Sequence, residues 1–80
     1  MPSIHVLFGI VISMNFVDGE HNPPHVHARY GDYNATYNIK TGKLIDGYMP
    51  LKQNKHMKGF LSTYKETLLE MWETQDIHKI

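Results

Sequence analysis

Three histidines and an arginine lie close together in the segment His21-Asn22-Pro23-Pro24-His25-Val26-His27-Ala28-Arg29. After the two prolines, polar and apolar side chains alternate, as they do in a strand, where side chains two positions apart point to the same face. We therefore expect His25, His27 and Arg29 to stand side by side. Imidazole rings in such a row bind a metal ion, transfer protons near neutral pH or contact phosphate.

The first chemistry that these histidines allow is metal binding. His25 and His27 supply two ligands, and His21 supplies a third if its loop folds back across the prolines. Three protein ligands and a water molecule are typical of a catalytic zinc site. A divalent metal such as zinc is therefore the cofactor that this interpretation implies. Thiolate ligands are excluded, because the chain has no cysteine.

The second chemistry is metal-free cleavage of RNA. One imidazole removes the proton of a 2′-hydroxyl, the other protonates the leaving oxygen, and Arg29 holds the phosphate. Polar side chains beside the histidines offer hydrogen bonds to sugar and phosphate, and lysines further along the chain offer charge. The residues expected to contact RNA or a partner protein are Asn34, Thr36, Asn38, Lys52, Lys55 and Lys58.

A third interpretation gives the histidines a structural role. They would hydrogen-bond across a hairpin to Asn38 and Thr36, or to carbonyl groups of the proline loop. The protein would then act by binding another protein, either an operon partner or a second copy of itself. The residues leave these three interpretations open.

A hairpin is the element that positions these side chains. Residues 25–30 and 33–39 have the pattern of two strands joined by Gly31-Asp32, and glycine at the first turn position suits a type II′ turn. A two-residue turn places Val26 opposite Tyr37 on an apolar face and His27 opposite Thr36 on a polar face. We therefore expect the histidines on the polar face of a sheet.

The remaining elements follow from the spacing of apolar residues. Alternation over residues 4–16, ending at Phe16, predicts one long strand with a bulge or bend at Gly9. Residues 43–47 predict a short strand, and residues 51–74 predict one helix with an apolar stripe. The predicted fold is α+β: an antiparallel sheet of three to four strands with one long C-terminal helix packed on its apolar face. We expect residues 75–80 to fray.

Length and composition limit the class of protein. Eighty residues favour a single domain over residues 1–80 with one modest core. The chain has no cysteine, no basic N-terminal region and no apolar run near ~18 residues. We therefore expect a cytoplasmic protein without a membrane segment. The long apolar first strand favours a homodimer.

Charge is balanced overall but segregated along the chain. The formal net charge is zero, which argues against a strong non-specific binder of nucleic acid. Residues 29–65 nevertheless carry seven basic and two acidic side chains, whereas residues 66–80 carry four acidic and one basic. A local basic patch is therefore expected.

Several segments together form a family pattern: His21-Asn22-Pro23-Pro24-His25-Val26-His27-Ala28, preceded by Met1-Pro2-Ser3-Ile4 and Phe8-Gly9-Ile10-Val11-Ile12, and followed by Tyr30-Gly31, Ile39-Lys40-Thr41-Gly42-Lys43 and Trp72. With these segments the chain resembles the small bacterial proteins known as domain of unknown function 4160. The resemblance covers nearly the whole chain, and the histidine–proline motif is specific. The chain departs from the pattern in two ways. The loop before His21 has an extra spacer, Asp18-Gly19-Glu20, so two acidic residues compete for any role that the family gives to one. The start of the helix is rich in lysine, where the family more often has arginine.

The resemblance also implies a setting for the protein. Members of this family look like standalone proteins from short operons, an organisation similar to toxin–antitoxin modules. The implied function is that of a toxin–antitoxin-like component that acts on RNA or on a partner protein from the same operon. His25 and His27 would be its working side chains, supported by His21 and Arg29.

Overall fold

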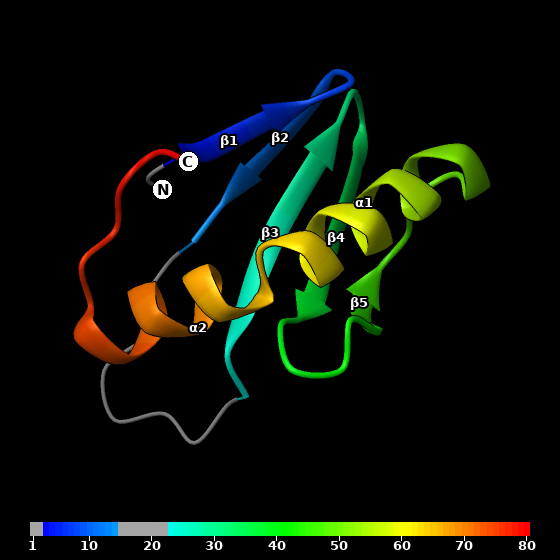
Figure 1. The fold of residues 1–80 in the computed structure, drawn as a ribbon. Helices are drawn as coiled ribbons and strands as arrows, with labels where there is room; N and C mark the ends of the chain where they lie inside the picture. The colour runs from blue at the N-terminus through cyan, green and yellow to red at the C-terminus, as the bar shows by residue number, and fades with distance from the viewer. Residues whose placement is uncertain (1–2, 15–22) are drawn as a thin grey trace.

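The computed structural model describes residues 3–14 and 23–80, which form a five-stranded antiparallel sheet and two helices. The strands follow one another across the sheet in chain order, and both helices lie across one face of it (Figure 1). The predicted α+β class with an antiparallel sheet is therefore confirmed. The elements are β1 (Ser3–Leu7), β2 (Ile10–Ser13), β3 (His25–Tyr30), β4 (Tyr33–Asn38), β5 (Leu44–Gly47), α1 (Leu51–Thr63) and α2 (Lys65–Thr74).

The long first strand of the prediction is instead a hairpin of β1 and β2. Phe8 and Gly9 have φ angles of 47° and 80°, so both turn residues are left-handed, as a type I′ turn requires. The reversal places Val6 opposite Val11 on the face without helices, while a bulge in β1 leaves Ile4 in the core. The sheet consequently has five strands, and the expected three to four was wrong.

The single long helix of the prediction was also wrong, because the helix is interrupted at Tyr64. This residue has φ −108° and ψ 17°, which end α1 and begin α2. Backbone hydrogen bonds from Tyr64 N–H to Phe60 O and from Leu68 N–H to Tyr64 O span the interruption. The predicted apolar stripe therefore continues over both helices, and its buried members are Met57, Phe60, Leu61, Leu68 and Met71.

The register of β3 and β4 is the one that the alternation predicts. Val26 lies opposite Tyr37 and His27 opposite Thr36, and Gly31 in the turn has a φ of 59°. Val26 and Tyr37 are both fully buried beneath the helices. The other side of the same ladder therefore carries the polar pairs.

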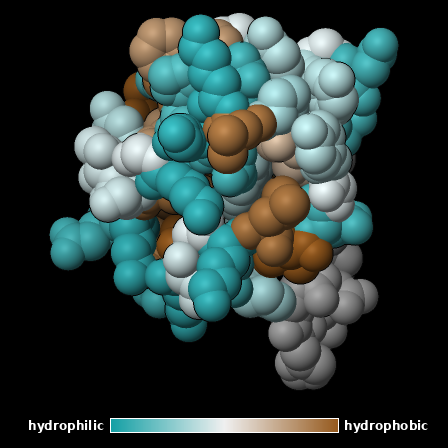
Figure 2. Space-filling model, turned by 90° about the vertical axis from the view of Figure 1, so that its right-hand side faces the viewer, coloured by the Kyte–Doolittle hydropathy of each residue, from teal (hydrophilic) through white to brown (hydrophobic). Residues whose placement is uncertain are grey.

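Strand β5 packs unusually close to β4 at one glycine. A Cβ atom on Gly47 would overlap the carbonyl oxygen of Asn34, and Gly47 has a φ of +84°. The same carbonyl accepts a hydrogen bond of 2.9 Å from Tyr48 N–H. Glycine is therefore required where β5 joins the sheet. Figure 2 shows hydrophobic side chains among hydrophilic ones on one side of the molecule. Leu44 and Ile45 of β5 and Leu51 of α1 are exposed.

The C-terminal segment returns to β1 rather than fraying as expected (Figure 1). Ile80 N–H donates a hydrogen bond of 2.7 Å to Ile4 O, and Ile80 O lies 3.0 Å from His5 Nδ1. Ile77 and Ile80 also pack against the core, which explains why the segment stays attached. Within the described residues, neither helix has the length and apolar character needed to cross a membrane.

Candidate functional site on the open sheet face

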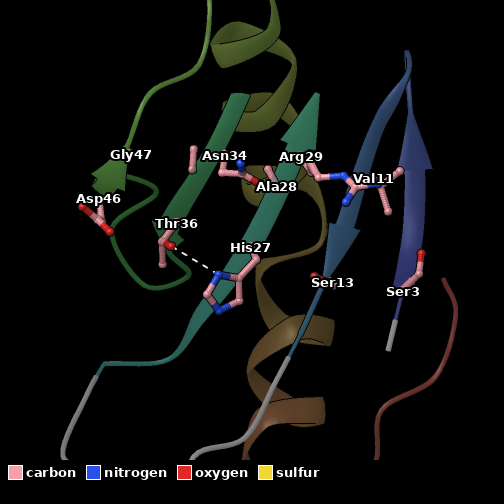
Figure 3. Close-up of a pocket in the computed structure, with 11 residues that line it drawn as sticks. Ser3, Val11, Ser13, His27, Ala28, Arg29, Asn34, Thr36, Asp46 and Gly47 are labelled. Atoms are coloured by element: carbon pink, nitrogen blue, oxygen red, sulfur yellow. Dashed lines mark hydrogen bonds between the residues drawn. The ribbon is translucent and has the colours of Figure 1, made fainter. Parts of the chain in front are cut away.

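The face of the sheet opposite the helices contains a hollow of about 580 Å³ (Figure 3). Alternate residues of each strand point toward it, because side chains along a strand alternate between the two faces. All five strands contribute residues to its walls. The polar side chains that line it are Ser3, Ser13, His27, Arg29, Asn34, Thr36 and Asp46.

His27 is the titratable ring in this hollow. Its Nδ1 lies 3.3 Å from Thr36 Oγ1 on the neighbouring strand, and the hydrogen bond between them fixes how the ring leans (Figure 3). Burial, and secondly the charge of nearby His25, lower the pKa of His27 below its usual 6.5. The ring is therefore neutral at pH 7. In the tautomer with a proton on Nδ1, the Nε2 lone pair is available as a base.

His25 is adjacent to His27 but does not line the hollow. Its side chain is 8% exposed, and its ring lies 5.0 Å from the ring of Trp72 on α2. Nδ1 of His25 donates a hydrogen bond of 3.0 Å to Pro23 O, and the His25 and His27 rings meet edge to face at 5.1 Å. His25 thus links the start of β3 to α2 and packs against the ring of His27. Of the two imidazoles expected on the open face, only that of His27 lines the hollow.

Arg29 points away from His27 on the same face. Figure 3 shows its side chain extending across β2 toward Val11, with Asn34 on its other side. Arg29 is exposed and has no ion-pair partner among residues 3–14 and 23–80. Its guanidinium is therefore open to an external anion such as phosphate.

Three polar side chains of the hollow were missed by sequence reasoning: Ser3, Ser13 and Asp46. Ser13 lies opposite His27 on β2, and Asp46 lies opposite Thr36 on β5. Ser13 was missed because β1 and β2 were predicted as one strand, so neither was paired with β3. The signal that was available is Gly9, which marks a two-residue turn as well as a bulge.

The remaining predicted contact residues lie elsewhere. The side-chain oxygen of Asn38 accepts hydrogen bonds from the backbone N–H groups of Lys40 and Thr41, at 2.8 and 3.2 Å, and so holds the β4–β5 loop. Lys52, Lys55 and Lys58 are on α1, which covers the opposite face of the sheet (Figure 1). The lysines therefore do not share a surface with Asn34 and Thr36. His21, Phe16, Asp18 and Glu20 lie outside the described residues.

The described part of the chain offers no group of three metal-ligating side chains. His25 and His27 are neighbours, but His25 uses Nδ1 for the Pro23 carbonyl and its ring is covered by Trp72. Since His21 lies outside the described residues, the three-histidine set cannot be assembled from this structure. The geometry therefore gives the zinc interpretation no support.

The fold and this site define a class: a small α+β protein whose antiparallel sheet is covered by helices on one face and presents a polar hollow with a neutral histidine on the other. The chain belongs to the family described as Domain of unknown function (DUF4160), whose pattern matches residues 9–73. The expected resemblance is therefore confirmed. A comparison with curated proteins and a comparison with solved structures each found no match.

Proposed function

We propose that the open sheet face binds single-stranded RNA and that His27 acts there as a base toward a ribose 2′-hydroxyl. The observation that carries this proposal is the neutral His27 ring in a polar hollow that also holds Arg29, a guanidinium without an ion-pair partner in the described residues. Arg29 would hold a phosphate, and Ser13, Asn34 and Thr36 would hydrogen-bond to sugar and phosphate. The protein would act as the RNA-directed component of a toxin–antitoxin-like operon.

The proposed reaction is transfer of a phosphodiester to the neighbouring 2′-oxygen. The 2′-oxygen forms a bond to phosphorus as its proton passes to His27, and the bond from phosphorus to the 5′-oxygen breaks. The products are a 2′,3′-cyclic phosphate and a 5′-hydroxyl. Because His25 is buried against Trp72, water rather than a second imidazole protonates the leaving oxygen.

Binding is tested with a fluorescently labelled single-stranded RNA at several salt concentrations. Replacing Arg29 with alanine should weaken binding and reduce the slope of log K against log salt by about 0.7, the value for one phosphate contact on a single strand. Lys52→Ala is the matched control, since it removes the same charge from α1 on the other side of the sheet. If Arg29→Ala and Lys52→Ala have equal effects, RNA does not bind on the open face.

Cleavage is tested by detecting the cyclic phosphate end. The rate should rise with pH up to the lowered pKa of His27 and then level, because the neutral ring is the active form. His27→Gln should abolish product while RNA binding persists, and should relieve any growth arrest that expression of the protein causes. A substrate with a 2′-deoxyribose at the cleavage site should be resistant, and its cleavage would exclude this reaction.

A second candidate function is binding of a partner protein from the same operon, or of a second copy in a homodimer. The observation that favours it is the pair Val6 and Val11, which lie opposite each other on the open face and are 62% and 37% exposed. Val6→Asp should then prevent association in sedimentation measurements and leave RNA binding unchanged. If Val6→Asp instead weakens RNA binding and leaves association unchanged, the result supports the RNA proposal.

A further inference from the structure

A second hollow, of about 340 Å³, lies between the β4–β5 loop and the helices. Four of the seven lysines of the chain line it: Lys40, Lys43, Lys58 and Lys65. No carboxylate of the described residues lines it, and none of these lysines has an ion-pair partner in that part of the chain. The hollow is therefore a concentration of uncompensated positive charge.

The loop that carries two of these lysines is held by hydrogen bonds. Asn38 N–H donates to Lys43 O at 2.9 Å, and Gly42 N–H donates to Asn38 O at 2.8 Å. The Asn38 side-chain oxygen accepts from Lys40 N–H and Thr41 N–H, and Lys43 N–H donates to Thr41 Oγ1 at 3.2 Å. The backbone positions of Lys40 and Lys43 are thus fixed before any ligand arrives, which lowers the entropy lost on binding.

The positions of the lysines do not serve the stability of the free protein. Lys65, the first residue of α2, lines the hollow together with three other lysines. Lys58 of α1 lines the same hollow as the two loop lysines, so like charges lie near one another and repel. A ligand with several negative charges would relieve this repulsion.

We propose that this hollow binds a chain of linked phosphates, as found in inorganic polyphosphate or in the phosphate tail of a nucleotide. Lysines from three separate segments line the hollow, and several positive charges suit several adjacent phosphates better than one. The hydroxyl of Thr41 accepts the Lys43 N–H and keeps its own hydrogen to donate, and the Ser62 hydroxyl is on the same rim. No aromatic ring of the described residues lines the hollow, so recognition is of phosphate and not of a base.

This site is separate from the proposed RNA surface. Lys58 and Ser62 belong to α1, and this helix covers the face of the sheet opposite His27 and Arg29 (Figures 1 and 3). The two hollows share no lining residue, so substitutions in one should not alter binding in the other. Failure of either proposal does not affect the other.

The experiment is a titration of the full chain with inorganic tripolyphosphate, followed by amide NMR shifts and calorimetry. The largest shifts are expected at residues 40–43 and 58–65. The double variant Lys43→Ala/Lys58→Ala should weaken binding at least about tenfold, since two charged contacts are lost. The matched control Lys52→Ala/Lys55→Ala removes equal charge from α1 outside this hollow and should weaken binding by less than about twofold. All four residues are exposed, so both variants should fold.

Two further arms identify what is recognised. A nucleoside triphosphate should bind as tightly as tripolyphosphate, and the nucleoside without phosphates should not bind. Single phosphate should bind much more weakly than tripolyphosphate, and Lys43→Arg/Lys58→Arg should retain binding. Equal loss in the two double variants, the absence of saturable binding, or tight binding of the free nucleoside would overturn the proposal.

Discussion

Replacing each of the two neighbouring histidines with alanine should have very different effects on stability. His25→Ala removes a hydrogen bond to Pro23, worth about 0.5–1.5 kcal/mol, and a ring contact with Trp72, worth about 0.5–1.5 kcal/mol beyond the buried area. With the side chain 8% exposed, a loss of about 2–3 kcal/mol in the free energy of unfolding is expected. His27→Ala loses a longer hydrogen bond, 3.3 Å to Thr36, and should cost about 1 kcal/mol or less.

The two variants are compared by urea unfolding at pH 7.5. For a domain of this size a difference of 1 kcal/mol shifts the melting temperature by roughly 4–8 °C, so the two variants are easily separated by thermal unfolding as well. NMR titration of the remaining ring adds a second readout. In His25→Ala the pKa of His27 should rise toward its usual value, since the nearby charge that lowers it is gone and burial is reduced.

Equal losses in the two variants would refute the assignment of His25 to the structure and His27 to the open site. So would a larger loss for His27→Ala. His25→Phe separates the two contributions of His25, because a ring against Trp72 is retained and the hydrogen bond to Pro23 is removed. It should recover the ring contact, which amounts to about half of the lost free energy.

Three further predictions concern other contacts. The pKa of His27 in the folded protein lies below 6.5, so the unfolded chain binds more protons around pH 6. The free energy of unfolding should therefore fall as pH drops from 7 through 6.5. In urea titrations at several pH values, His27→Gln should reduce this dependence on pH. Tyr37→Phe should cost about 1 kcal/mol through its 2.7 Å hydrogen bond to Asn54. Burial raises the pKa of Tyr37 above 10.0, so stability should be unaffected below pH 10 and decrease above it, a decrease that Tyr37→Phe should lessen. Gly47→Ala should cost more than about 2 kcal/mol in chemical unfolding, whereas Gly59→Ala, in open space on α1, should stabilise by about 0.5–1 kcal/mol.

Sequence patterns predicted the parts of the fold in which local and tertiary preferences agree. The register of β3 and β4 followed from a glycine turn and from alternation on both strands, because a slip by one residue would have buried His27 and exposed Val26. The apolar stripe of the helices was predictable for the same reason. Neither prediction required knowledge of distant contacts.

The errors arose where the same pattern has two physical solutions. Alternation continues through Phe8-Gly9 whether the chain bends or reverses, and a bulky Phe8 with a positive φ is not a residue from which a type I′ turn is expected. His25 alternates with His27, yet Trp72 from α2 covers it. Such a contact depends on where a helix crosses the sheet, and a strand pattern carries no information about that crossing.

The order of the strands has a consequence for how the chain folds. Each ladder joins segments that are neighbours along the chain, so the sheet can grow one hairpin at a time, and single hairpins form in roughly 1–10 µs. The bond between His5 and Ile80 is different, because it closes a loop between residues 75 positions apart. Folding should therefore be rapid, with the ends of the chain joining last. A variant that lacks Ile80 should fold at an unchanged rate but unfold faster, because the contacts of Ile80 with β1 form only after the transition state.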